Sequence, residues 1–121
     1  MSVTDSFRTF VLEQLKRVVP DIRSRSMFGG VGIYAGDLFF ALMDDDAVYL
    51  KTDDSNRKDF EQRGMGPFQP YGVGGETMAY HQLPEDILES PEALGQWAER
   101  AITVARQARG RRSRRVRKKQ G

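Results

Sequence analysis

The chain has 121 residues, of which 30% are charged, with no cysteine and a single histidine. This length fits one domain with its own hydrophobic core. The absence of cysteine excludes disulfides, thiolate metal ligands and a thiol nucleophile, and the single histidine excludes histidine-rich metal sites. No apolar run has the length of a signal peptide or a membrane span, so we expect a cytoplasmic protein with no membrane partner.

The net charge of +2 conceals two oppositely charged parts. Residues 106–121 carry seven arginines and two lysines without an acid, for a charge of +9. The other 105 residues carry ten bases and all seventeen acids, for a charge of −7. We therefore divide the chain into a folded domain, residues 1–108, and a basic, flexible C-terminal tail, residues 109–121.

The N-terminal half predicts a helix and then three strands. Apolar residues at helical spacing run from Phe7 to Val18, after a cap at Thr4 or Asp5 and before Pro20, which ends the helix. Apolar runs at 31–34, 38–43 and 47–51 are separated by turns at 35–37 and 44–46, as in an antiparallel meander. In the last run, Val48 and Leu50 share one face, and Tyr49 and Lys51 share the other.

The C-terminal half predicts a second helix from residues 52–54 to Gly64, an extended segment at 67–71, a glycine turn at 72–75 and a strand at 77–81. Residues 84–88 predict one helical turn. Ser90-Pro91 begins the strongest helix, which we expect to end at Gly110. The order α-βββ-α-ββ-α indicates an α+β fold with an antiparallel sheet of about five strands and helices packed on it.

Several segments resemble the N-terminal domain of the TfoX/Sxy proteins: residues 27–34 (MFGGVGIY), Gly36, 39–41, 49–51, 67–68, 78–80, 83–85 and 97–98. The resemblance covers roughly residues 5 to 105. It implies an α+β domain with a curved antiparallel sheet, often dimeric and without established catalytic residues. The founding members are regulators of natural competence that co-activate transcription, and a second, helix-hairpin-helix-like domain follows in them. The resemblance therefore implies a short stand-alone member that lacks this C-terminal domain.

Two loops are candidate ion sites. Backbone N–H groups of residues 29–32 (GGVG) are a candidate phosphate cradle, but the segment is neither a GxGxxG motif nor a P-loop and opens a hairpin. Glycine at positions of positive φ or close chain approach is the simpler explanation. Asp44-Asp45-Asp46 is a candidate cation site, but contiguous acids lack the spacing of a calcium loop, which favours a solvated turn.

His81 lies near Glu85 and Asp86 in the sequence, but no serine or cysteine nucleophile accompanies it in a recognisable frame, so we expect a structural histidine. A set of aromatic residues falls on the predicted sheet: Phe28, Tyr34, Phe39, Phe40, Tyr49, Phe68, Tyr71 and Tyr80. Such residues stack nucleobases in single-strand binders. Because this region is acidic overall, we favour core packing, with some of the rings in a dimer interface.

The tail is the strongest candidate binding site. Its proposed nucleic-acid-binding residues are Arg109, Arg111, Arg112, Arg114, Arg115, Arg117, Lys118 and Lys119. If about six cations met phosphates, log K would fall with log salt at a slope near −5. The alternatives are a solubilising end and a tail folded back on the acidic domain.

We therefore expect a non-enzymatic regulatory or accessory protein that associates with nucleic acid through its tail. We expect a homodimer or a complex with another protein, and no cofactor, metal or small-molecule substrate. The alternative is a dimerisation module without nucleic-acid binding. The third hypothesis is an enzyme or small-ligand binder whose site lies on the sheet.

Overall fold

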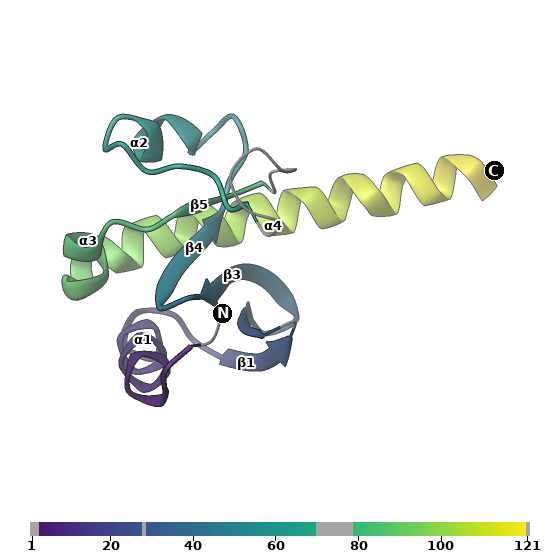
Figure 1. The fold of residues 1–121 in the computed structure, drawn as a ribbon. Coiled ribbons are helices and arrows are strands. Elements are labelled where there is room, and N and C mark those ends of the chain that lie inside the picture. Colours follow the sequence, from purple (N-terminus) through teal and green to yellow (C-terminus); the bar gives the residue numbers. More distant parts are fainter. Residues whose placement is uncertain (1–2, 28, 70–78, 121) are drawn as a thin grey trace.

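The computed structural model describes residues 3–27, 29–69 and 79–120, with side chains up to Arg111. The elements are α1 (Asp5–Val18), β1 (Ile22–Met27), β2 (Gly30–Ala35), β3 (Leu38–Asp44), β4 (Ala47–Lys51), α2 (Arg57–Glu61), β5 (Tyr80–Gln82), α3 (Glu85–Glu89) and α4 (Pro91–Gln120). Figure 1 shows their arrangement. The predicted turn at 72–75 and the first two residues of the strand predicted at 77–81 lie outside the described residues, and the rest of that prediction falls on β5, which begins at Tyr80.

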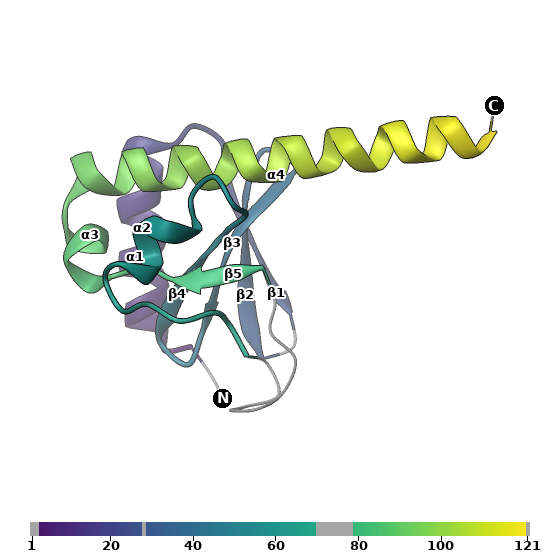
Figure 2. The same cartoon turned by 90° about the horizontal axis from the view of Figure 1, so that it is seen from above.

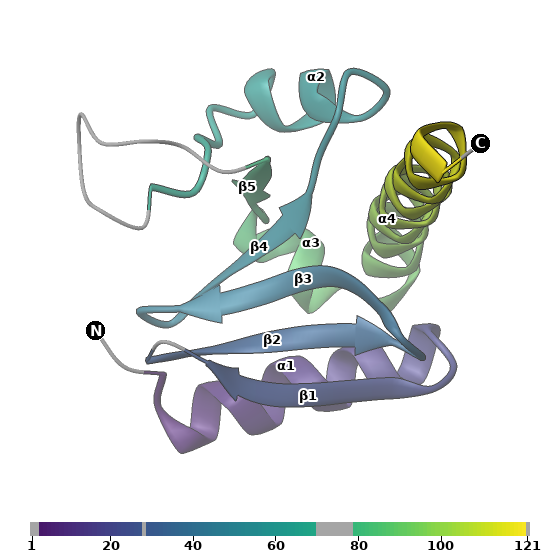
Figure 3. The ribbon, with the colours of Figure 1, turned by 90° about the vertical axis from the view of Figure 1, so that its right-hand side faces the viewer.

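The five strands form one antiparallel sheet in the order β1-β2-β3-β4-β5, with each strand paired to its neighbours in the chain (Figure 3). The α+β class and the five-stranded antiparallel sheet are therefore confirmed. The distribution of the strands differs from the prediction, because four precede α2 and one follows it. In the segment predicted as extended at 67–71, only Pro67 makes a β-bridge, to His81, and residues 70–71 lie outside the described part.

The main core lies between one face of the sheet and helices α1, α3 and α4, and Phe60 of α2 belongs to it as well. Val11 and Leu15 of α1 and Leu94 of α4 are fully buried against strand residues such as Ile33 and Leu50. Full burial of one such side chain stabilises the fold by about 1.5–3 kcal/mol. The side chains on the other face of the sheet do not belong to this core.

A β-bulge in β3 changes which residues reach the core. Ile33 pairs with Ala41 and Tyr34 pairs with Phe39, which leaves Phe40 as an extra residue between them. Phe40 and Ala41 are consequently both fully buried in the main core, although they are neighbours in the sequence. The bulge also turns Phe39 to the opposite face.

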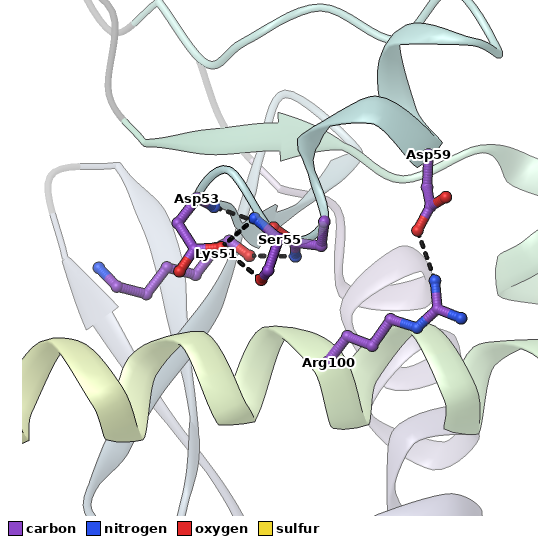
Figure 4. Close-up of polar contacts among 6 residues, drawn as sticks. Lys51, Asp53, Ser55, Asp59 and Arg100 are labelled. Carbon is purple, nitrogen blue, oxygen red and sulfur yellow. Dashed lines mark hydrogen bonds and ion pairs between the residues drawn. The ribbon is translucent and has the colours of Figure 1, made fainter.

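The loop after β4 is longer than predicted, so the second helix begins later in the sequence. We predicted that this helix begins at residues 52–54, but α2 begins at Arg57, because residues 53–56 form a turn. Asn56 closes this turn: its side-chain amide donates to the backbone oxygen of Lys51 and accepts from the backbone N–H of Asp53. Asp59 of the helix forms an exposed ion pair with Arg100 of α4 (Figure 4), and the buried ring of Phe60 packs on Trp97 of α4 with centroids 4.8 Å apart.

Helix α4 crosses the domain, and its C-terminal half extends beyond the sheet (Figures 1 and 2). The prediction that Gly110 ends this helix is wrong, because the helix continues to Gln120. Glycine costs a helix only about 1 kcal/mol, and the flanking arginines are good helix formers. The division of the chain at residue 108 stays a prediction.

Candidate nucleic-acid interface

The basic end of α4 begins with cations that the structure describes. Arg106, Arg109 and Arg111 are exposed on the part of the helix that leaves the sheet. The other predicted binding residues belong to the same helix, and their side chains lie outside the described part: Arg112, Arg114, Arg115, Arg117, Lys118 and Lys119. A helix that carries this many cations is an electrostatic surface for polyanions.

One predicted binding residue already has an acidic partner. A guanidinium nitrogen of Arg109 lies 2.8 Å from a carboxylate oxygen of Asp37, in the turn between β2 and β3. The hydrogen bond and the charge of Arg109 lower the pKa of Asp37. Both side chains remain largely exposed, so the contact stabilises the fold little. It nevertheless places the start of the tail beside the β2–β3 turn.

A cleft of about 530 Å³ lies where the end of α1, the β2–β3 turn and α4 meet. Its walls are apolar at Val18, Leu38 and Ile102, and polar at Glu99 and Arg106 of α4. The cleft is wide and open, and no titratable cluster converges in it among the residues that line it. We assign no chemistry to this cleft.

The candidate phosphate cradle has a structural explanation. Gly29 has a φ of 81°, which favours glycine. A Cβ at Gly30 would lie 2.5 Å from the backbone oxygen of Met43, and one at Gly32 would lie 2.5 Å from the end of the Met27 side chain. Gly30 is therefore needed because the β3 backbone approaches it closely, whereas at Gly32 the close atom is the movable end of a side chain.

The acidic triplet forms a turn that is tied to α1. Asp45 and Asp46 have φ values of 50° and 55°, as the two central residues of a type I′ hairpin turn do. The carboxylate of Asp46 accepts hydrogen bonds from the backbone N–H and the hydroxyl of Thr4, at 2.8 and 3.1 Å. Across the described residues, no cluster of three or more histidine or acidic side chains could hold a metal ion.

His81 is buried in a structural position. Its Nδ1 lies 2.8 Å from the hydroxyl of Thr52, and its ring centroid lies 5.7 Å from that of Phe60. Asp86, one of its predicted acidic partners, instead forms an ion pair with Arg63. Among the described residues, the hydrogen bond of the His81 ring is to a buried hydroxyl, and neither Glu85 nor Asp86 is hydrogen-bonded to the ring.

The prediction of core packing is wrong for most of the aromatic set, while the place of some rings in a dimer interface stays a prediction. Of its described members, only Phe40 belongs to the main core cluster, while Phe28 and Tyr71 lie outside the described residues. The register places Tyr34, Phe39, Tyr49 and Tyr80 on the face of the sheet opposite the helices. Tyr34, Phe39, Tyr49 and Phe68 are half-buried, and Tyr80 is buried. We call this surface the aromatic face.

The family assignment follows from comparison of the whole chain. The model of the TfoX N-terminal domain matches residues 13–105. The chain belongs to the TfoX N-terminal domain family. No curated protein matches the chain significantly.

This family is a domain of competence regulators, with no known catalysis. The match covers the segment from α1 to the part of α4 that packs on the sheet, and it ends at Ala105. Among the helices that the structure describes, none has the length and apolar character that crossing a bilayer requires. The basic end of α4 lies beyond the matched residues.

Proposed function

We propose that this TfoX-like protein is a non-enzymatic regulatory or accessory module whose basic tail associates with nucleic acid without sequence preference. The observation that supports it is the course of α4, which carries exposed Arg106, Arg109 and Arg111 past an otherwise acidic domain. Phosphate contacts of this kind give binding in the micromolar range that weakens steeply with salt. The folded domain would supply protein contacts.

A salt-titrated binding assay on duplex DNA tests this function. The intact chain is compared with a chain that ends at residue 108, which retains Ala105, the last residue of α4 that is buried among the described side chains. A full-length variant with Arg111, Arg112, Arg114 and Arg115 changed to glutamine serves as the second comparison. We expect both altered chains to lose retention at low salt while their unfolding midpoints stay unchanged. Equal binding by all three proteins would refute the role of the tail.

We also propose a homodimer, as the alternative in which the domain is an interaction module. Two features of the described part favour it. Phe10 of α1 is 40% exposed and is the one large apolar side chain there that is exposed. Strand β1 lies at the edge of the sheet, where its outer backbone groups can pair with another strand.

Sedimentation of the intact protein tests the dimer. We expect a mass of two chains, and we expect Phe10→Ser to shift the equilibrium toward the monomer, whereas Thr9→Ser should leave it unchanged. A monomer at every concentration would rule out this alternative.

A further inference from the structure

The aromatic face carries side chains in two rows that cross the sheet. The first row begins with the paired residues Arg23, Tyr34 and Phe39 of β1, β2 and β3. It continues through the ring contact of Phe39 with Tyr80, which is paired with Lys51. The second row runs through the pairs Arg25–Gly32, Gly32–Leu42, Leu42–Tyr49 and Tyr49–Gln82. Because paired residues point to the same side of a sheet, each row lies on one face.

Contacts on both sides of the sheet support this assignment. Arg8 of α1 lies 3.5 Å from the hydroxyls of Ser24 and Ser26, so these two serines point toward the helices. Arg23 and Arg25 alternate with them and therefore point to the aromatic face. Gly32 also belongs there, since a Cβ at this position would contact Met27 and Phe39.

The rings of the first row contact one another in series. The centroids of Tyr34 and Phe39 lie 5.1 Å apart, and those of Phe39 and Tyr80 lie 5.6 Å apart. In the second row, Phe68 packs on Tyr49 with centroids 4.8 Å apart. Leu42 and Tyr80 are buried without belonging to the main core cluster. The face thus has a supporting layer of its own, and the half-buried rings of Tyr34, Phe39, Tyr49 and Phe68 lie upon it.

Three cations border this face. Arg23 and Arg25 are exposed at its β1 edge, and the Nζ of Lys51 lies 5.0 Å from the centroid of the Tyr80 ring. Asp21 partly neutralises Arg23, with N and O atoms 3.0 Å apart. Asp44 and Asp45 lie at the opposite end, near Tyr49, and Asp37 lies near Arg23. The first row therefore joins cations to rings that contact one another, away from Asp44 and Asp45.

We propose that the aromatic face binds single-stranded nucleic acid, with bases stacked on Tyr34, Phe39, Tyr49 and Phe68 and the phosphate backbone passing Arg23, Arg25 and Lys51. Aromatic rings interleaved with cations are the arrangement that sequence-tolerant single-strand binding requires, because every base has a π-face. A protein partner would use the same rings but would gain less from three cations at the rim. This site is separate from the tail, which contacts phosphates alone.

The test uses the full-length protein and three labelled probes: an oligothymidylate of about 12 nucleotides, an abasic oligomer of equal charge, and a duplex of equal length. Fluorescence polarisation is measured at about 0.2 M salt, where contacts to phosphate alone are weak. We expect the oligothymidylate to bind at least about fivefold more tightly than the abasic oligomer. Equal binding of these two probes would overturn the proposal.

Point variants locate the site. Tyr34→Leu and Tyr49→Leu should each weaken oligothymidylate binding about fivefold or more, and Tyr34→Phe and Tyr49→Phe should bind as the native protein does. Arg25→Gln should weaken binding about twofold or more, whereas Arg17→Gln, the same charge change on exposed α1, should not. Unfolding midpoints identify any variant that has lost its fold. If the tyrosine variants are lost in this way, the comparison of Arg25→Gln with Arg17→Gln tests the site.

The duplex probe separates this proposal from the proposed function. If the leucine variants leave oligothymidylate binding unchanged while duplex binding depends on the tail, the aromatic-face proposal fails and the tail function stands. If the oligothymidylate binds in a ring-dependent manner and the duplex does not bind at any salt, the tail function fails and the aromatic face stands. Binding of neither nucleic acid refutes both.

Discussion

The imidazole of His81 is held by the hydroxyl of Thr52, with Nδ1 and Oγ1 2.8 Å apart in a buried position between β4 and β5. Thr52→Val removes the hydroxyl and leaves the buried ring nitrogen without its partner. We expect a loss of roughly 1–3 kcal/mol in the free energy of unfolding, measured by urea denaturation. Thr103→Val is the control, because this hydroxyl is exposed on α4, and its loss should cost less than about 0.5 kcal/mol.

The stability of the protein should fall as the pH drops below about 6.5, the ordinary pKa of histidine. Burial lowers the pKa of His81, an effect that the charge of Glu61 opposes and that of Arg57 reinforces. The unfolded chain consequently binds a proton at pH values where the folded protein does not, so acid favours unfolding. The stabilisation is complete above pH 6.5 and is lost as the pH falls toward the lower folded pKa. Urea denaturation at pH 7.5 and at pH 5.5 measures this loss.

His81→Gln is the control for the pH dependence, because glutamine can accept a hydrogen bond and does not titrate. The variant should be less stable than the native protein at pH 7.5, and the difference should shrink at pH 5.5. If the difference in unfolding free energy were the same at both pH values, the pKa of His81 would be the same in the folded and unfolded states.

The turn between β4 and α2 depends on one buried side chain. Asn56 is 2% exposed and makes two hydrogen bonds of 2.9 and 3.0 Å to the backbone of Asp53 and Lys51, whose loop is drawn in Figure 4. Asn56→Ala should cost roughly 1–3 kcal/mol of unfolding free energy, since it removes two hydrogen bonds to partly buried backbone groups. Ser55→Ala, one residue earlier and exposed, should cost much less. Similar losses from both would contradict the role of Asn56.

Two glycines should respond oppositely to alanine. Gly30→Ala places a Cβ 2.5 Å from the backbone oxygen of Met43, so β2 and β3 must separate, at a cost of about 1–3 kcal/mol. Gly110 lies within α4 and has open space where its Cβ would be. Gly110→Ala should therefore stabilise the helix by about 1 kcal/mol and raise the far-UV helical signal without lowering the unfolding midpoint. A drop in helicity would indicate that α4 does not continue past Gly110 in solution.

Much of this fold is readable from local signals in the sequence. Pro91 begins α4, Thr4 caps α1, and Asp45-Asp46 makes the β3–β4 turn, because each of these features depends on a few adjacent residues. Strand β1 has no such signal: its four central residues are polar and exposed, and it exists because it pairs with β2 along its whole length. An edge strand without an apolar face cannot be found from hydrophobic periodicity.

The aromatic face could not be predicted from the sequence, in part because strand β1 was not predicted. The alternation in β4 correctly predicts that Tyr49 and Lys51 share a face. The bulge at Phe40 separates two adjacent phenylalanines onto opposite faces, which period-2 reasoning cannot detect. Without β1, moreover, Arg23 and Arg25 have no place on the sheet, and the region is judged acidic. Burial alone could not distinguish the two layers of aromatic residues before the register was known.

The ion pair between Arg109 and Asp37 predicts unequal roles for two neighbouring tail residues. Arg109 is already paired with an acid, whereas Arg111, two residues further along α4, is exposed. If the tail binds duplex DNA, Arg111→Gln should reduce the slope of log K against log salt by about 0.9, the value for one lost phosphate contact. Arg109→Gln should reduce it less, because Asp37 competes with phosphate for this guanidinium. Asp37→Asn should release Arg109 and strengthen duplex binding at low salt. Equal slopes for the two arginine variants, together with unchanged binding by Asp37→Asn, would mean that the ion pair does not limit Arg109 in the complex.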